Sequence, residues 1–179
     1  GYLGYFEGFT TLYQAHQNPA IRHFVAELMD EAAATLGKRL EYDWRIFKEE
    51  WIRRFDNPAL RVETAQLRIE TSHILMYAIV PAVAKRLRHR LSIEHHAKVL
   101  ALWIRWLMQA CETGAESLND LRAAQLIERV NAAGGAQADP FAVVDNVLSL
   151  DAIFGPVLSK DAEFKRVVAI SLQQSMVAP

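Results

Sequence analysis

A run of polar side chains between Gln66 and Tyr77 has the residue types that could line a water-filled pocket. Gln66, Glu70, His73 and Tyr77 follow one another at intervals of four, three and four residues, so on a helix they would share one side. A polar stripe on a helix is most often a solvated face, but histidine and tyrosine in such a stripe can also line a binding site. Both interpretations stay open from the pattern alone.

The sequence does not favour a metal site or a self-contained active site. Glu70 and His73 have the Glu-x-x-His spacing of di-iron helical bundles, but such a site needs a second copy and the sequence has none. Glu94-His95-His96 has the wrong spacing for joint ligation. No serine or cysteine nucleophile motif is present. Gly134-Gly135 lies between predicted helices rather than in a phosphate-binding loop, so no cofactor-binding signature is found.

Cationic side chains stand out at two places. The run from Lys85 to Arg90 is expected to end a helix, where positive charge complements the negative end of the helix dipole. The alternative is that this basic run binds a phosphate or an acidic neighbour. Arg105 is the only charge between Val99 and Met108. A buried arginine needs a carboxylate or carbonyl partners, so structural pairing and substrate contact are equally open for Arg105.

Helices must position these side chains, because apolar residues recur at helical spacing throughout and no stretch alternates as a strand would. Asn18-Pro19, Asn57-Pro58 and Asp139-Pro140 each combine a capping side chain with a proline, so each predicts a helix start. Pro81 predicts a kink or break. The sequence therefore predicts an all-α fold, with helices over residues 18–36, 44–55, 58–90, 93–113, 120–133, 140–148 and 161–176, and with stops at Gly37 and Gly114.

The composition indicates an ordinary folded domain without a nucleic-acid or membrane partner. Of 179 residues 51% are hydrophobic, and 20 Lys plus Arg balance 21 Asp plus Glu, so no strong field attracts nucleic acid or anionic lipid. The apolar run from Val99 to Ile104 is far too short to cross a bilayer. The single Cys111 favours a reducing compartment, which we expect to be the cytoplasm. The opening at Gly1, without methionine, suggests that the chain starts within a longer protein.

Five segments resemble, in order, the C-terminal domain of the mannitol dehydrogenase family, which includes mannitol and arabinitol dehydrogenases and the fructuronate and tagaturonate reductases. They are residues 1–8 (GYLGYFEG), 18–25 (NPAIRHFV), 54–61 (RFDNPALR), 101–107 (ALWIRWL) and 149–164. Each motif is modest, but together they cover nearly the whole chain. The resemblance implies a multi-helix fold similar to the 6-phosphogluconate dehydrogenase C-terminal-like fold, with residues 1–179 as a single substrate-side domain.

The resemblance also implies what this chain lacks. Family members move a hydride between NAD or NADP and a polyol, ketose or sugar acid without a metal, and an N-terminal domain binds most of the nucleotide. Their Lys-x-x-x-Leu-Asn-x-x-His motif supplies a general base and stabilises the reacting oxygen. That motif would fall before Gly1 here. We therefore expect no catalytic, cofactor-binding or metal-binding residue in this chain, a missing nucleotide-binding domain, and no activity of the chain alone.

A second family element, Asp-Gly-Ser-x-Lys followed by Leu-Pro, corresponds to Glu70-Thr71-Ser72-His73-Ile74 and Leu75-Met76. Ile74 stands where the family has a substrate-facing lysine. A neutral wall suits polyol hydroxyls, whereas Arg68 could bind a sugar-acid carboxylate through a bidentate contact. The predicted substrate-facing residues are Gln66, Arg68, Glu70, His73 and Arg105.

The expected function is the substrate-binding C-terminal domain of a polyol or sugar-acid oxidoreductase of the mannitol 2-dehydrogenase or fructuronate reductase type. The alternative, motivated by Ile74 in place of lysine, is a non-catalytic helical interaction or ligand-binding module of the same fold. The expected partners are the missing nucleotide-binding domain and a small polyol, ketose or sugar acid. A face left by the missing domain could make the isolated chain self-associate.

Overall fold

The computed structural model describes residues 1–36, 43–59, 61–113 and 118–177. Within these ranges every regular element is helical, apart from one antiparallel bridge between Thr11 and Glu63. The all-α fold predicted from the sequence is confirmed. The chain forms two compact units, of which unit 1 consists of Gly1–Arg68 and Lys85–His95, and unit 2 of Ile69–Ala84 and His96–Pro179.

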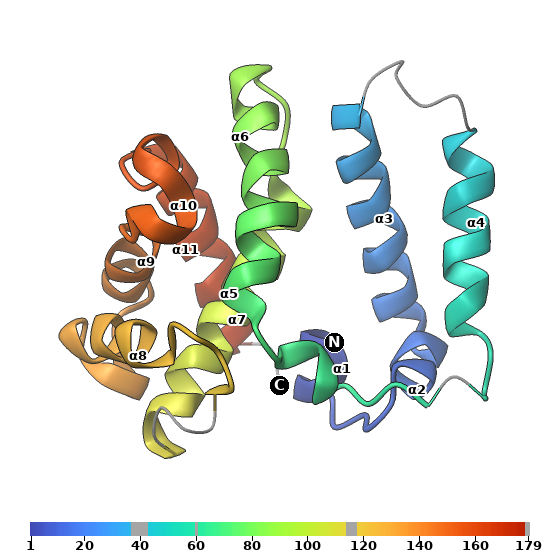
Figure 1. Ribbon diagram of the computed structural model, residues 1–179, viewed down its shortest axis with the longest axis horizontal. Helices are drawn as coiled ribbons and strands as arrows, with labels where there is room; N and C mark the ends of the chain where they lie inside the picture. The colour runs from blue at the N-terminus through green and yellow to red at the C-terminus, as the bar shows by residue number, and fades with distance from the viewer. Residues whose placement is uncertain (37–42, 60, 114–117, 178–179) are drawn as a thin grey trace. The chain divides into compact units, whose positions relative to one another are not determined.

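Unit 1 combines short helices with two longer ones. α1 (Tyr2–Phe6) and α2 (Leu12–Gln17) precede α3 (Pro19–Leu36) and α4 (Trp44–Phe55), and η2 is a 3-10 turn at Gln66–Arg68. α3 packs against α2 and α4 (Figure 1). The side-chain Oδ1 of Asn18 accepts the backbone N–H of Ala20 at 2.9 Å, which confirms the predicted start of α3. The predicted stop at Gly37 lies outside the described residues.

The helix predicted to begin at Pro58 is wrong. The Asn57 side chain accepts the N–H of Ala59 at 3.0 Å, but only a turn follows. The next residues instead run antiparallel to the segment ahead of α2: Leu12 donates its N–H to the Val62 carbonyl at 2.9 Å, and Thr64 donates to Thr10 at 3.0 Å. These pairings with a distant segment satisfy the backbone and override the local helix-start signal.

A kink or break is predicted at Pro81, and the structure has no break there but a wider helical turn just before it. In unit 2, α5 (Thr71–Ile74) leads directly into η3, a π-helical turn at Leu75–Ile79. The chain continues into α6 (Val80–Arg88), which contains Pro81 and passes into unit 1 at Lys85. A proline ring would collide with the carbonyl of the residue four positions earlier, here Tyr77. The π-helical turn around that residue changes the spacing, so the helix continues through the proline.

The core of unit 2 is built around α7 (Glu94–Thr113), whose residues 100–104 and 106–108 are buried, as the apolar pattern predicts. Arg105, between these two stretches, is half-buried. The buried ring of Trp103 lies 6.3 Å from that of Phe154, which lies 6.3 Å from Phe164. Around α7 are α8 (Ala123–Ala132), η5 (Gly135–Gln137), α9 (Pro140–Leu148), α10 (Asp151–Leu158) and α11 (Ala162–Val177). α9 packs against α8 and α11 (Figure 1).

Three predicted helix starts around this core are confirmed by side-chain caps. Ser92 accepts the N–H of Glu94 at the start of α7, Asp139 accepts that of Ala142 in α9, and Asp161 accepts that of Phe164 in α11. α10 was not predicted, and it bends at Gly155, where φ is 69°. The predicted stop of α7 at Gly114 lies outside the described residues.

No single helix in the described ranges has both the length and the apolar character needed to cross a membrane. α9 and α10 satisfy that length and composition test only when taken together, and they are bent by 94° at the break between them.

Candidate functional site

The predicted polar stripe does not lie on one helix face. Gln66 and Arg68 belong to η2 in unit 1, whereas Glu70 and His73 belong to unit 2. Glu70 adopts the left-handed backbone conformation, with φ 50° and ψ 37°, and α5 starts only after it. This backbone reversal interrupts the helical register between Gln66 and His73, so the prediction of a continuous face is wrong. The assignment of these residues to a substrate stays a prediction.

Arg68 is held by an aromatic ring within unit 1. Its guanidinium carbon lies 3.9 Å from the centre of the Tyr5 ring, a cation–π contact. The side chain is half-buried. Stacking fixes the plane of the guanidinium, and a fixed plane is what bidentate binding of a carboxylate requires.

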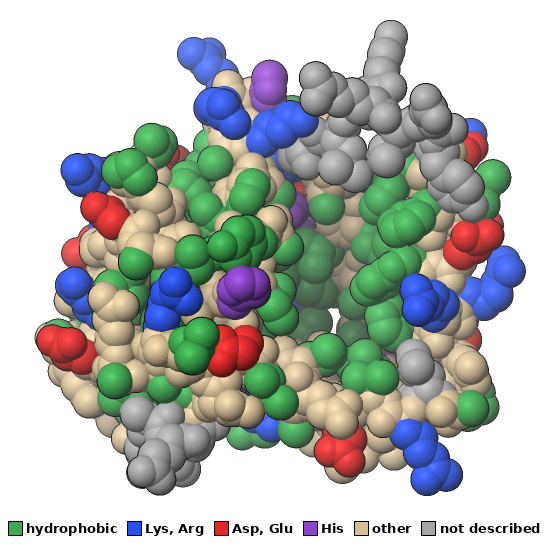
Figure 2. Space-filling model, in the orientation of Figure 1, with side chains coloured by type: hydrophobic (Ala, Val, Ile, Leu, Met, Phe, Trp, Pro, Cys, Tyr) green, Lys and Arg blue, Asp and Glu red, His purple; other side chains and the backbone are tan. Residues whose placement is uncertain are grey.

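An exposed aromatic pair lies on α5 and η3 in unit 2. The rings of His73 and Tyr77 have their centres 4.6 Å apart, and Tyr77 is 69% exposed. Ile74, at the position of the family lysine, is also exposed. In the space-filling view, hydrophobic side chains gather over this stretch (Figure 2). Such a surface offers ring faces to the C–H groups of a sugar, and a ring nitrogen and a hydroxyl to its oxygens.

The first turn of α5 is hydrogen-bonded to Asp120 through Ser72. Ser72 is fully buried; its N–H donates to Asp120 Oδ2 at 2.8 Å and its hydroxyl donates to Asp120 Oδ1 at 2.7 Å. The sequence analysis missed Asp120. Because 48 residues separate the two partners, no local spacing could have found it.

Arg105 lies away from the exposed aromatic pair. It is half-buried, and its Nη1 donates to the backbone carbonyl of Ser175 in the last turn of α11. It also lines a surface hollow of about 260 Å³ formed by residues of α7, η5 and α11, with none from α5 or η3. The backbone contact matches the structural interpretation of Arg105. Its contact with a substrate stays a prediction.

Arg86, which belongs to the basic run that is expected to end a helix, is buried. It is 6% exposed and donates to the backbone carbonyls of Glu31 and Ser92. Its position three residues after the buried Val83 was the available signal, because that spacing puts both on one helix face.

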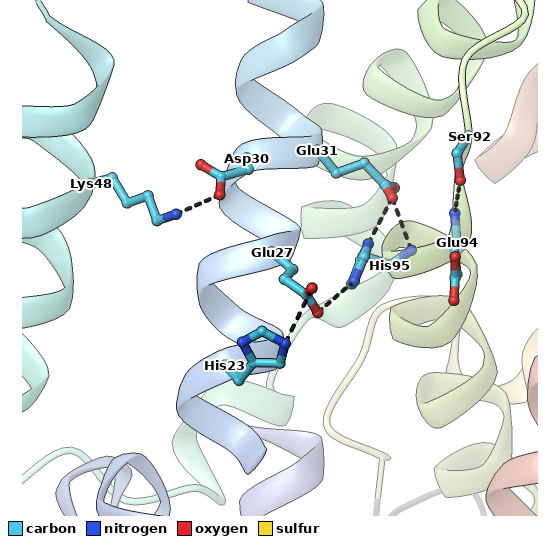
Figure 3. A network of polar contacts seen from close by, with 8 residues as sticks. All are labelled: His23, Glu27, Asp30, Glu31, Lys48, Ser92, Glu94 and His95. Atoms are coloured by element: carbon cyan, nitrogen blue, oxygen red, sulfur yellow. Dashed lines mark hydrogen bonds and ion pairs between the residues drawn. The ribbon is translucent and has the colours of Figure 1, made fainter. Parts of the chain in front are cut away.

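His95 in unit 1 is enclosed by two carboxylates from α3, as Figure 3 shows. Its Nδ1 lies 2.9 Å from Glu31 Oε2, and its Nε2 lies 3.1 Å from Glu27 Oε2. Glu31 Oε2 also accepts the backbone N–H of His95 at 3.0 Å, and Glu27 Oε1 lies 3.2 Å from His23 Nε2. Since both ring nitrogens face an acceptor, the arrangement suits an imidazolium that carries both protons.

The two glutamates raise the pKa of His95. Burial lowers the pKa of His95, but the hydrogen bonds and negative charges of Glu31 and Glu27 outweigh it, so the pKa is raised above its ordinary value. His95 is therefore suited to holding α3 to the start of α7 rather than to accepting a proton. Over the described ranges, no group of three or more His, Cys, Asp or Glu side chains could hold a metal ion.

Comparison with known proteins places this arrangement in a family. The model of the mannitol dehydrogenase C-terminal domain matches residues 1–176. D-mannonate oxidoreductase of Escherichia coli (strain K12) is 31% identical over 175 residues, which are 97% of this chain and 35% of that protein. Mannitol 2-dehydrogenase of Phaeosphaeria nodorum is 26% identical over 166 residues, 92% of this chain and 28% of that protein. This chain thus spans about a third of the length of the relatives it matches.

A solved structure shows the same fold. It is the Pseudomonas fluorescens mannitol 2-dehydrogenase ternary complex with NAD and D-mannitol, which matches with a TM-score of 0.83 at 20% identity. The match covers 98% of this chain and 35% of that one. The resemblance predicted from the five sequence segments is confirmed: the chain belongs to the mannitol dehydrogenase family and corresponds to its C-terminal domain.

Proposed function

We propose that residues 1–179, with their two compact units, form the substrate-side domain of an NAD- or NADP-dependent oxidoreductase acting on a polyol or a sugar acid. The observation that carries this proposal is the family match over residues 1–176. The relatives' names include both mannitol 2-dehydrogenase and D-mannonate oxidoreductase, so the relatives support both substrate classes. A cytoplasmic location and metal-independent chemistry remain part of the proposal.

The chain contributes substrate contacts rather than the reacting groups. The nicotinamide, bound mainly by a separate domain, would accept or supply the hydride, and the Lys, Asn and His motif expected ahead of Gly1 would handle the proton. In this chain Ile74 cannot hydrogen-bond, so recognition of sugar hydroxyls falls to its neighbours His73 and Tyr77. Their exposed, paired rings fit that role.

Arg68 separates the two substrate classes. Its guanidinium, fixed on Tyr5, would bind the carboxylate of a sugar acid and has no charged partner in a neutral polyol. Removal of Arg68 should therefore raise the KM for an acid much more than the KM for a polyol.

The test uses the native gene product in full, including whatever sequence precedes Gly1. Turnover of NADH and NADPH is measured with fructose and fructuronate, and that of NAD and NADP with mannitol and mannonate. We expect one pair to react, and His73→Ala to lower kcat/KM about tenfold through the loss of a hydrogen bond. His23→Ala, which removes an exposed histidine that pairs with Glu27, is the matched control and should leave the rate unchanged.

Absence of turnover with every pair would contradict the oxidoreductase proposal. A native product without a nucleotide-binding fold would instead favour the non-catalytic interaction module.

A further inference from the structure

α5 has no capping side chain of its own. The residue at its N-cap position, Glu70, is in the left-handed conformation and its side chain caps nothing. The first N–H groups of a helix need acceptors from elsewhere. Ser72, the second residue of α5, finds one in the Asp120 carboxylate at 2.8 Å, across 48 residues of sequence.

The Asp120 carboxylate binds more than this one group. Oδ1 accepts the Ser72 hydroxyl at 2.7 Å and the backbone N–H of Arg122 at 2.9 Å, while Oδ2 accepts the Ser72 N–H. Each of these bonds has an ionised acceptor, which makes it stronger than a bond between neutral groups. Ser72 is fully buried, so water does not compete for its two donors.

The backbone on both sides of this contact is strained. Glu70 and Asn119 have φ values of 50° and 39°, which side-chain-bearing residues rarely adopt. The two residues are joined directly, because Glu70 donates its N–H to the Asn119 carbonyl at 3.0 Å. Strain of this kind persists only where the surroundings fix it, and Asp120 supplies the charged hydrogen bonds that do so.

The contact determines which side chains of α5 face outward. Thr71 and Ser72 are buried, His73 and Ile74 are exposed, and Leu75 is buried again. Successive residues of a helix lie about 100° apart around its axis, so the Ser72–Asp120 contact fixes the rotation of α5 at which His73 lies on the surface. There the ring of His73 meets that of Tyr77.

We propose that Asp120 is a positioning residue that sets the orientation of His73 and Tyr77 as a substrate-binding wall. The claim that this wall binds substrate rests on the proposed function, whereas the claim that Asp120 orients α5 does not. Asp120 touches no reacting atom and acts through Ser72.

The structural part is tested on the 179-residue chain by amide hydrogen exchange. Asp120→Ala should speed exchange of the amides of residues 71–75 about tenfold, and Ser72→Ala, which keeps the N–H bond, should have a smaller effect. Asp161→Ala is the control, because Asp161 caps α11 in the same unit through Phe164. Unchanged exchange in both Asp120→Ala and Ser72→Ala would overturn the proposal. If Asp120→Ala does not fold, Ser72→Ala decides alone.

The catalytic part is tested on the full gene product with the sugar that it turns over. Asp120→Ala should raise KM about fivefold with little change in kcat, and Asp120→Glu should recover part of that loss by retaining the carboxylate. An unchanged KM would overturn the substrate role of Asp120. If the unmodified protein turns over no sugar, the proposed function fails, while the exchange experiment still decides whether Asp120 positions α5.

Discussion

Two histidines, one in each unit, have opposite surroundings. In the described part of the chain the ring of His73 has no hydrogen-bond partner and meets only Tyr77, whereas both ring nitrogens of His95 are held by carboxylates. His95 directly follows Glu94, His73 lies three residues after Glu70, and each histidine lies in the first turn of its helix. The difference is that α5 is capped by Asp120, which leaves His73 free for a ligand, while both ring nitrogens of His95 are used in contacts with Glu27 and Glu31 of α3. Histidine near a helix start therefore indicates neither role by sequence alone.

The largest expected effect tests the structural side of this comparison. Arg86→Ala should lower the free energy of unfolding by about 3 kcal/mol, because it removes the charged donor from the buried Glu31 carbonyl and the part-buried Ser92 carbonyl. The neighbouring Arg88 is exposed, and Arg88→Ala should cost less than about 0.5 kcal/mol. Urea denaturation of both variants measures the difference, and equal midpoints would mean that the buried contacts of Arg86 contribute nothing.

Substitutions of the two histidines should have the next largest difference in the free energy of unfolding. His95→Gln should lower the free energy of unfolding by about 2 kcal/mol near pH 6, because Glu31 is only 6% exposed at its side chain and loses its cation. His73→Gln should change it by less than about 0.5 kcal/mol, since the ring is on the surface. The same denaturation assay compares them. Equal losses would remove the distinction between a structural and an available histidine.

A smaller effect should appear with pH. The folded-state pKa of His95 is raised, so its contribution to stability is fully present below the ordinary value of 6.5 and is lost as the pH rises through the folded-state pKa. The stability gap between the unmodified chain and His95→Gln should therefore shrink as the pH rises above the ordinary value of 6.5 and through the raised folded-state pKa of His95. Denaturation at several pH values measures the gap. A gap that widens with pH would show that neutral His95 makes the better contact.

Removal of metal ions is expected to have no effect on the stability of the chain. Neither histidine lies in a group of described side chains that could hold a metal ion, so EDTA should leave the unfolding midpoint of the chain unchanged. A lowered midpoint that zinc or manganese restores would mean that a metal ion binds the chain at a site other than His73 and His95.

Local chemistry made much of the fold predictable. Asn18, Ser92, Asp139 and Asp161 each cap a helix whose start is marked within a few residues, and the apolar stretch of α7 is buried as its pattern indicates. The same Asn-Pro signal failed at Asn57, because the following segment pairs with residues 10–12.

The candidate site was predictable only in part, for the same reason. The resemblance directed attention to Glu70 and His73, but no local pattern reveals the left-handed backbone at Glu70 or the hold of Asp120 on Ser72. The burial of Arg86 within the basic run was not predicted, although its aliphatic stem and its donors to Glu31 and Ser92 suit the interior.

The π-helical turn at Leu75–Ile79 has a consequence for how the helix can change. The turn contains one residue more than an α-helical turn. The side chains after it are therefore rotated by about 100° around the helix axis, relative to their positions in a continuous α-helix. Deleting one residue of the turn would restore a regular α-helix and rotate Val83 away from the core while His73 stayed in place. A single insertion or deletion here, rather than any substitution, is thus the change that would separate the outward face of α5 from the buried face of α6.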